Sequence, residues 1–437
     1  MLPPRNLILV IFIFSLVFSQ GPLNSFGIGN HQTWSSPSQG GIGSIGLVPS
    51  FQNQVSLSNP ATWTNLKYTH LSVSYDGFES KINKSKARNS FSSLQSAQII
   101  IPIKQKYSFG IELHPYAYQQ VILSDTLYDD IFVFEDTISI SKEYEQAGGI
   151  MAFDLSMSAS LIKGSNIGLT MQLLFGSSRQ NNSLILNQIP YSQTSRLNYS
   201  GINSIIFISQ KSSIGNFYLK SSFSINPLEA IYTKMYPYDD TNNNGYHDFT
   251  YSVLNPGYDF PHPNDVPNPN ESRIKNIHDQ SSIGIGYSKN ILNRFQISGE
   301  FERCKDNSSF DIKLPNSFNY RIKSSDNISI GFIWYPNDLS YNFIDNLTFR
   351  SGIAFSRNAL DKYDIINGSR IDYKNDITQF GYTLGFGYKF KTVGNQIDFT
   401  YYSGLRDYPE IHNDEKLRQF QIGLNIADIW FIKRRQR

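Results

Sequence analysis

The chain has few of the features that usually cross-link a protein or anchor it in a membrane by a helix. Cys304 is the only cysteine among 437 residues, which excludes an internal disulfide framework and a four-cysteine zinc site. The net charge of +2 decides nothing about partners, and we expect no nucleic-acid partner. After residue 20 no segment is long and apolar enough to form a transmembrane helix. Any membrane residence must therefore come from strands.

The first twenty residues read as a segment that is separate from the fold. One base, Arg5, precedes an apolar run over residues 7–18, and Val17, Phe18 and Ser19 resemble a cleavage site. We therefore predict a secretory signal peptide over residues 1–19. The alternative is a membrane anchor, but a spanning helix needs roughly 20 apolar residues. No cysteine follows the run, which excludes a lipoprotein anchor.

Aromatic residues and strand-like alternation dominate what remains. The chain has 31 Phe and 27 Tyr, and residues 151–161 alternate apolar side chains with Asp or small side chains. Helical periodicity of comparable length is absent. The alternation predicts fourteen strands, near residues 69–77, 95–103, 107–115, 147–161, 166–176, 198–209, 216–225, 281–288, 295–304, 325–335, 346–356, 377–390, 396–403 and 416–428.

Short and long connections alternate between these fourteen strands. An even number of antiparallel strands with short turns at one end and long loops at the other is typical of an outer-membrane β-barrel. A water-soluble β-sandwich is the alternative, but it gives no reason for loop lengths to segregate by end. Several tyrosines lie near strand ends, where we expect an aromatic girdle: Tyr116, Tyr118, Tyr199, Tyr287, Tyr335, Tyr388, Tyr401 and Tyr402.

Residues 20–68 lack a strand pattern and are rich in Gly, Ser, Asn and Pro. Their apolar residues, such as Trp34, Phe51 and Trp63, argue for burial. A fourteen-stranded barrel leaves a lumen that wall side chains do not fill. We therefore predict a hatch over residues 20–68 that plugs a transmembrane barrel over residues 69–437. The GIGSIG segment, Gly41–Gly46, matches G-x-G-x-x-G but lacks the strand and helix that a nucleotide site requires.

Three stretches resemble the long-chain fatty acid transporter family of outer membranes, the FadL/TodX group. They are Asn59, Pro60 and Ala61 before the first strand, YSFGIELHPYAY at residues 107–118, and the closing FQIGLNIADIWFIKRRQR at residues 420–437, although the last ends in a basic tail rather than a terminal aromatic. The resemblance implies fourteen strands and a kinked third strand with a lateral window. It also implies a gate or substrate path formed by Asn59, Pro60, Ala61, Gly110, Pro115 and Tyr116.

Proline in a strand has a physical meaning of its own. Pro115 cannot donate a hydrogen bond to a ladder, so it interrupts pairing or kinks the strand. In lipid, such a gap must be covered by protein or line an opening. The alternative is that Pro115 simply ends the strand at the membrane interface.

One loop has the spacing of a calcium site. Asp240, Asn242, Asn244, Gly245 and Asp248 occupy positions 1, 3, 5, 6 and 9 of a calcium-loop pattern. The twelfth position is Tyr251 rather than Glu, and no helices flank the loop over residues 238–249. The alternative is a solvated turn without metal. We expect no other cofactor.

These observations favour passive uptake of small hydrophobic molecules across the outer membrane of a diderm bacterium. Apolar runs at residues 121–123 and 131–134 lie in an acidic segment over residues 116–145, where cargo has a first landing place. The alternative is a barrel scaffold that anchors secreted or secretion-machinery proteins, with an unknown protein partner. A hydrolase is the weakest alternative, since G-x-S-x-G and H-E-x-x-H are absent. Lipid and hydrophobic cargo are the other expected partners, and we expect no enzyme activity.

Overall fold

The fold is known from a computed structural model of the full chain. It describes residues 22–32, 34, 36–82, 88–124, 129–133, 136–162, 164–186, 189–240, 247, 249–250, 257–292, 294–308, 320–337, 342–366, 369–390, 394–408 and 413–428. In these ranges, no helix is long and apolar enough to cross a membrane. The predicted signal peptide over residues 1–19 lies outside the described residues.

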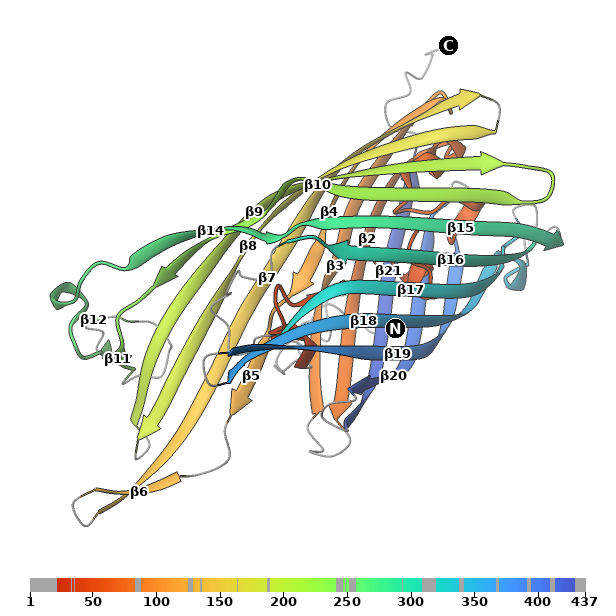
Figure 1. The fold of residues 1–437 in the computed structure, drawn as a ribbon. Helices are drawn as coiled ribbons and strands as arrows, with labels where there is room; N and C mark the ends of the chain where they lie inside the picture. Colours follow the sequence, from red (N-terminus) through yellow and green to blue (C-terminus); the bar gives the residue numbers. More distant parts are fainter. Residues whose placement is uncertain are drawn as a thin grey trace, which may run out of the picture.

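Fourteen long antiparallel strands form a closed barrel, as the sequence predicts (Figure 1). The first strand, β2, pairs with the last, β21, from Thr69 opposite Asp428 to Ile82 opposite Glu415, and this seam closes the cylinder. Closure pairs the backbone groups that a flat sheet would leave open at its edges. The strands are β2 (Thr69–Ile82), β3 (Arg88–Ile103), β4 (Tyr107–Tyr118), β7 (Asp136–Ile162), β8 (Ser165–Leu186), β9 (Ile189–Lys211), β10 (Asn216–Lys234), β15 (Gln280–Leu292), β16 (Phe295–Asp306), β17 (Tyr320–Trp334), β18 (Leu347–Ile366), β19 (Ser369–Lys389), β20 (Gln396–Tyr408) and β21 (Asn413–Asp428).

The alternating pattern sorts side chains to the two faces of the wall. In β7, Leu155 and Met157 are exposed on the outer face, whereas Asp154 and Ser158 are buried on the inner face. The same division holds in β21, where Ile422 and Leu424 face outward and Gln421 and Asn425 face inward. Apolar side chains outside and polar side chains inside are what a lipid-embedded barrel requires.

The strands extend well beyond the predicted boundaries at the end with the long connections, called here the loop end. The predicted long loops over residues 177–197 and 357–376 are instead hairpins, β8–β9 and β18–β19. Beyond the lipid, a polar side chain on the outer face faces water and carries no free-energy penalty. Polar segments can therefore continue the strand ladder there. For this reason the alternation of apolar residues ends before the strands do. Strands β7–β10 project furthest from the barrel (Figure 1). Shorter elements complete this end or the connections: β5 (Val121–Ser124), β6 (Asp129–Val133), β11 (Tyr238–Asp239), β12 (Phe249–Thr250), β13 (Gly257–Tyr258), η5 (Pro263–Asp265), β14 (Asn270–His278) and η6 (Ile344–Asn346).

Only part of the predicted aromatic girdle faces outward. Tyr287 and Tyr401 lie on the outer face. In contrast, Tyr116, Tyr199 and Tyr402 are buried inside the lumen, where Tyr116 and Tyr199 join an apolar cluster. Tyr118 and Tyr335 also face the lumen. The prediction was wrong for these five because proximity to a strand end does not decide which face a residue occupies. The face depends on whether the residue occupies an odd or an even position in the strand, and a bulge shifts that alternation by one residue.

The N-terminal residues lie inside the barrel, coloured red in Figure 1. They run from the loop end, where Leu23 and Phe26 pack against Leu360 and Tyr408, to the opposite turn end, where Gln52 Nε2 donates to Gly394 O at 2.5 Å. We call Pro22–Gln32 the strap and Ser36–Leu66 the plug base. Their elements are η2 (Pro22–Ser25), β1 (Asn30–His31), α2 (Pro37–Gly40), η3 (Gln52–Gln54) and η4 (Pro60–Asn65).

Candidate functional site

The Asn59–Ala61 turn is fixed against the barrel wall. Asn59 is fully buried, accepts a hydrogen bond from the Ala61 N–H at 3.1 Å, and donates through Nδ2 to Leu47 O at 2.8 Å. This cap starts η4, with Pro60 at its first position. Ser209 Oγ of β9 donates to Ala61 O at 3.0 Å. The Asn59–Ala61 turn is thus fixed by hydrogen bonds to the plug base and to the wall. Its role as a gate stays a prediction.

Glycines in the wall make room for this turn. A Cβ on Gly168 of β8 would lie 2.6 Å from Ala61 N and 2.9 Å from Pro60 Cβ. A Cβ on Gly110 of β4 would lie 2.5 Å from the ring of Trp63. Gly110 is therefore a contact site for the plug, because any larger residue there would push Trp63 out of its place.

The GIGSIG segment binds a carboxylate of the barrel itself. Glu300 of β16 is buried and accepts hydrogen bonds from Ser44 Oγ at 2.8 Å, from Ile45 N at 2.5 Å, and from Val48 N. Backbone N–H groups converging on one anion form a nest, which is the use that glycine-rich turns make of their freedom. Charge-assisted bonds of this kind are about twice as strong as neutral ones.

A buried ion pair holds the plug base at a second point. Arg350 Nη1 of β18 lies 2.6 Å from Asp398 Oδ1 of β20, and both side chains are fully buried. The Arg350 Nε also donates to Ser50 O of the plug base at 2.9 Å. Asp398 accepts further bonds from Gln396 and Asn425. A network of this kind costs several kcal/mol if one charge loses its partner.

The strap lies at the loop end of the lumen and is held there by apolar contacts. Leu23 and Phe26 join one buried cluster with β18–β20, and Ile28 joins another with β4, β7–β10 and β14. All three side chains are at most 7% exposed. The strap therefore packs against both sides of the barrel wall at the loop end.

The wall has a gap between β3 and β4. Their ladder runs only from Ala97 opposite Leu113 to Ile103 opposite Tyr107. Beyond Leu113, β4 continues to Tyr118 while bonded to β7, with a bulge between Pro115 and Ala117 that leaves Tyr116 as the extra residue. The alternative that Pro115 ends the strand is therefore wrong. Pro115 instead lies where β4 leaves β3, and strap strand β1 pairs with Ala117 and Tyr118 in the gap.

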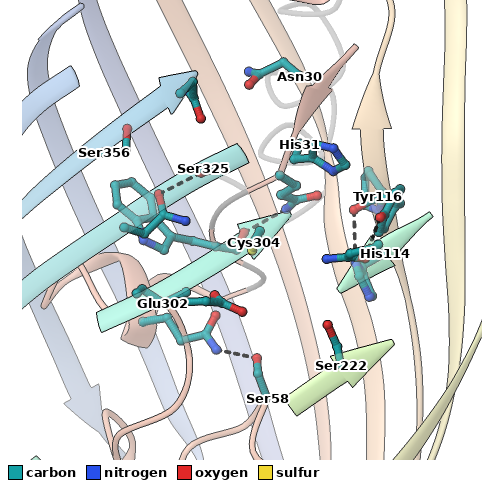
Figure 2. A pocket seen from close by; sticks show the side chains of 18 of the residues that line it. Asn30, His31, Ser58, His114, Tyr116, Ser222, Glu302, Cys304, Ser325 and Ser356 are labelled. Atoms are coloured by element: carbon teal, nitrogen blue, oxygen red, sulfur yellow. Dashed lines mark hydrogen bonds between the residues drawn. The ribbon is translucent and has the colours of Figure 1, made fainter. Parts of the chain in front are cut away.

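A cavity of about 350 Å³ lies in the lumen between the plug and the loop end. Figure 2 shows His31, His114 and Tyr116 together at one side of it, with Glu302 and Cys304 across from them. Polar pairs line the cavity: His114 with Asp154 at 3.3 Å, the ion pair of Lys220 with Glu302 at 2.7 Å, and His278 with Asp306 at 3.0 Å. Trp34, Phe78, Phe91 and Phe207 add apolar surface.

His31 of the strap is set among aromatic rings. Its ring centroid lies 5.0 Å from that of Tyr116 and 5.4 Å from that of His278. Burial, reinforced by the neighbouring His278, lowers the pKa of His31 to about 3 although Asp306 opposes the shift. His31 is therefore neutral at physiological pH. Tyr116 Oη donates to Gln280 Oε1 at 2.7 Å, which fixes the ring beside the strap.

The histidine–carboxylate pairs do not form a nucleophile and base. The second nitrogen of His114 lies 3.0 Å from Pro115 O, and that of His278 has no hydrogen-bond partner in the part of the chain that is described. A hydrolytic triad needs the base within hydrogen-bond reach of a serine or cysteine. Neither pair meets that condition.

The predicted calcium loop lies mostly outside the described residues. Only Asp240 of the four predicted ligands is described, and it is buried near Tyr238. Asn242, Asn244 and Asp248 lie outside the described residues, as does Gly245. Within the described ranges, no group of three or more His, Cys, Asp or Glu is arranged to hold a metal ion.

Several residues that organise the site were missed by sequence reasoning. They are the wall anchors and the strap contacts: Asn30, His31, Glu300, Glu302, Arg350 and Asp398. The available signal was the position of each residue in its strand, because alternate positions face the lumen. An ionisable residue on that polar face lies in a lumen that excludes bulk water. Such a residue needs a partner. The plug base supplies one to Glu300 and Arg350, and other wall strands supply those of Glu302 and Asp398.

Solved outer-membrane channels share this fold. The CymD monoaromatic hydrocarbon channel aligns with a TM-score of 0.54 at 12% identity, covering 92% of this chain and 99% of that chain. A Pseudomonas aeruginosa FadL homologue aligns with a TM-score of 0.54 at 12% identity, covering 91% and 99%. A TodX mutant channel aligns with a TM-score of 0.52 at 14% identity, covering 90% and 99%. At such identities the likeness shows the fold alone.

The search of curated proteins found no match. The protein-family model that matches is BamG, over residues 5–436, nearly the whole chain. The FadL/TodX resemblance of the sequence is thus confirmed for the fold, and the family model that matches the chain is BamG. Both findings identify an outer-membrane β-barrel of diderm bacteria. Because the chain forms a closed fourteen-stranded barrel and the family model matches residues 5–436, the chain belongs to the BamG family.

Proposed function

We propose that this chain is a structural, Bam-associated barrel of the outer membrane that presents its surfaces to protein partners. The observation that carries the proposal is the BamG family match over residues 5–436, which includes the plug as well as the wall. The alternative that the sequence left open, a barrel scaffold that anchors secreted or secretion-machinery proteins, is thus favoured over hydrophobic uptake.

The way the lumen is filled supports this role. Glu300 of β16 and Arg350 of β18 tie the plug base to the wall through buried charged groups. The strap packs against the wall at the loop end with three buried apolar side chains. A passive channel needs a plug that yields to cargo, whereas a scaffold gains from a rigid filled barrel. The filled lumen therefore suits a scaffold.

The lining of the cavity supports it as well. Sites for small apolar ligands are lined predominantly by apolar and aromatic side chains. Here three polar pairs, among them the Lys220–Glu302 ion pair, line the cavity beside the aromatic residues. Fatty-acid methylenes would gain little beside buried charges, since each CH₂ gains roughly 0.8 kcal/mol only when it leaves water for an apolar surface.

The experiment isolates the tagged chain from native outer membranes and measures its co-purifying proteins by quantitative mass spectrometry. A different barrel of the same membrane, carrying the same tag, is the control. We expect Bam components to be enriched with this chain and not with the control. Absence of every Bam component from the proteins that co-purify with the tagged chain would contradict the proposal.

Uptake of small hydrophobic molecules remains the second candidate, because the gap beside Pro115 lies where lateral release would occur. In this candidate Gly110, Pro115 and Tyr116 line the path and Asn59–Ala61 gates it. Radiolabelled fatty acid and toluene added to the purified barrel test it directly. Saturable binding that is lost when Gly110→Trp fills the lumen beside Trp63 would favour uptake over the scaffold.

A further inference from the structure

The edge of β4 above Leu113 is a sheet edge that the barrel does not pair with its own neighbour. Its ladder with β3 ends at Ala97 opposite Leu113. Two bulges separate the strands beyond that point: Gln95 is the extra residue in β3, and Tyr116 is the extra residue in β4. An unpaired edge of this kind is a template for another strand.

The strap already uses this edge as a docked peptide would. Asn30 and His31 pair antiparallel with Tyr118 and Ala117, and Gln32 N donates to Tyr116 O at 3.1 Å. Recognition by strand addition combines such backbone bonds with pockets for side chains. Ile28 enters the apolar cluster beside Ala117, and His31 lies against the Tyr116 and His278 rings.

Gly29 makes the close approach feasible. Its φ is +93°, and a Cβ there would overlap the carbonyl oxygen of Tyr118. Gln119 Nε2 donates to Ile28 O at 2.9 Å, which fixes the chain on the other side of the glycine. A segment that docks here therefore needs an apolar residue, then glycine, then an extended pair ending in a ring.

The fit of the strap is incomplete where it crosses the gap. Among the described residues, Gln32 Oε1 and Gln95 Oε1 are buried without a hydrogen-bond partner. Each such atom costs about 1–3 kcal/mol. A longer strand lying between β3 and β4 would have backbone groups to offer these atoms. The edge is therefore filled by only two paired residues, with polar atoms left over.

We propose that the β4 edge, His114–Tyr118, is a strand-docking site that β1 occupies in this structure and that an extended segment of a partner protein takes over from it. The strap is then an internal competitor whose tether gives it a high effective concentration. The partner segment has the chemistry that β1 displays: a branched apolar residue, a glycine, a small polar residue and an imidazole or aromatic ring. This inference rests on the proposed scaffold function.

A peptide with the sequence of residues 26–34, FGIGNHQTW, probes the site on the purified full chain. The chain carries Gly29→Val, which undocks the strap, and folding is checked by heat-modifiable gel migration. If that variant fails to fold, Asn30→Pro undocks the strap without a contact to the wall at Gly29. Binding is read from the anisotropy of the labelled peptide. A second readout is the labelling of Cys304, the only cysteine, which lines the cavity.

We expect saturable binding of the peptide to the variant, at least fivefold slower labelling of Cys304 when it is bound, and at least tenfold weaker binding to the wild-type chain. The matched control peptide, with valine at the position of Gly29, is expected not to bind. Equal binding of both peptides, or none to either variant, would overturn the inference. These measurements need no Bam component, so a negative result here is distinguishable from failure of the proposed function.

Discussion

The plug base and the strap fill the same lumen but are held by different forces. The base is tied to the wall by buried charges, through Glu300 and the Arg350–Asp398 pair. The strap is held by Leu23, Phe26 and Ile28 and by two paired backbone residues. Removing the partner of a buried charge costs the protein several kcal/mol of stability. Removing one apolar side chain costs only the contacts of that side chain. The comparison predicts that the base is held more strongly than the strap, and that the strap detaches first when contacts are removed.

The largest expected effect comes from breaking the buried ion pair of the base. Arg350→Ala leaves Asp398 buried without its charge partner, and we expect the free energy of unfolding to fall by about 3–5 kcal/mol. Urea titration of the folded barrel measures it. Arg357→Ala on the same strand is the control, because its pair with Asp376 is exposed and screened by water, so its loss should leave the unfolding curve nearly unchanged. Similar losses for both variants would refute the distinction.

Neutralising the carboxylate nest is expected to have the next largest effect. Glu300→Gln keeps the shape but removes the charge that three donors share, so we expect a loss of about 1.5–3 kcal/mol. The plug base should also become cleavable by added protease at Gly41–Gly46. Asp407→Asn, exposed on β20, is the control. An unchanged unfolding curve for Glu300→Gln would show that the nest does not hold the base.

Truncating the strap should affect access more than stability. Phe26→Ala removes a buried ring, yet the strap can detach while the base and barrel stay folded. We expect the free energy of global unfolding to change by about 1 kcal/mol or less, while thiol labelling of Cys304 becomes at least fivefold faster. Phe51→Ala in the base is the matched change, with an expected loss of about 3–5 kcal/mol. If Phe26→Ala left Cys304 as protected as before, the strap would not be the cover of the cavity.

The smallest expected effect is a weakening of the strap in acid. His31 is neutral when docked, with a pKa of about 3, and its free value is about 6.5. Below pH 6.5 the undocked strap binds a proton that the docked strap does not, so docking weakens as the pH falls, by at most about tenfold per pH unit. The effect is smaller than this limit because part of the ring faces the cavity.

The rate at which a thiol reagent labels Cys304 at pH 7.5 and at pH 5.5 measures the weakening of strap docking. The His31→Gln variant is the reference, because its labelling rate reports the pH dependence of the reagent itself. His278 and Asp306 also face His31, so the difference between the two proteins isolates the His31 contribution. Equal pH dependence in both proteins would exclude a role for His31.

Much of the wall was predictable because lipid imposes a simple rule on it. Residues 151–161 alternate over two faces with period two, and a lipid-embedded strand has no other way to satisfy both. Strand ends were less predictable, as in 177–197, because the rule stops at the membrane surface. Of the site, Gly110 and Pro115 could be singled out from their residue types. Glu300 and Arg350 could not, because nothing near them in sequence names the plug residues that they bind.

The sequence by itself determined a closed fourteen-stranded barrel with an N-terminal plug, since alternation, loop lengths and a buried-type leading segment are local properties of the chain. Only the tertiary structure decided which carboxylate enters the GIGSIG turn, which faces Tyr116 and Tyr402 take, and how β1 fills the gap beside β4. These contacts join residues up to hundreds of positions apart. Their geometry depends on bulges and register, which a periodic pattern does not encode.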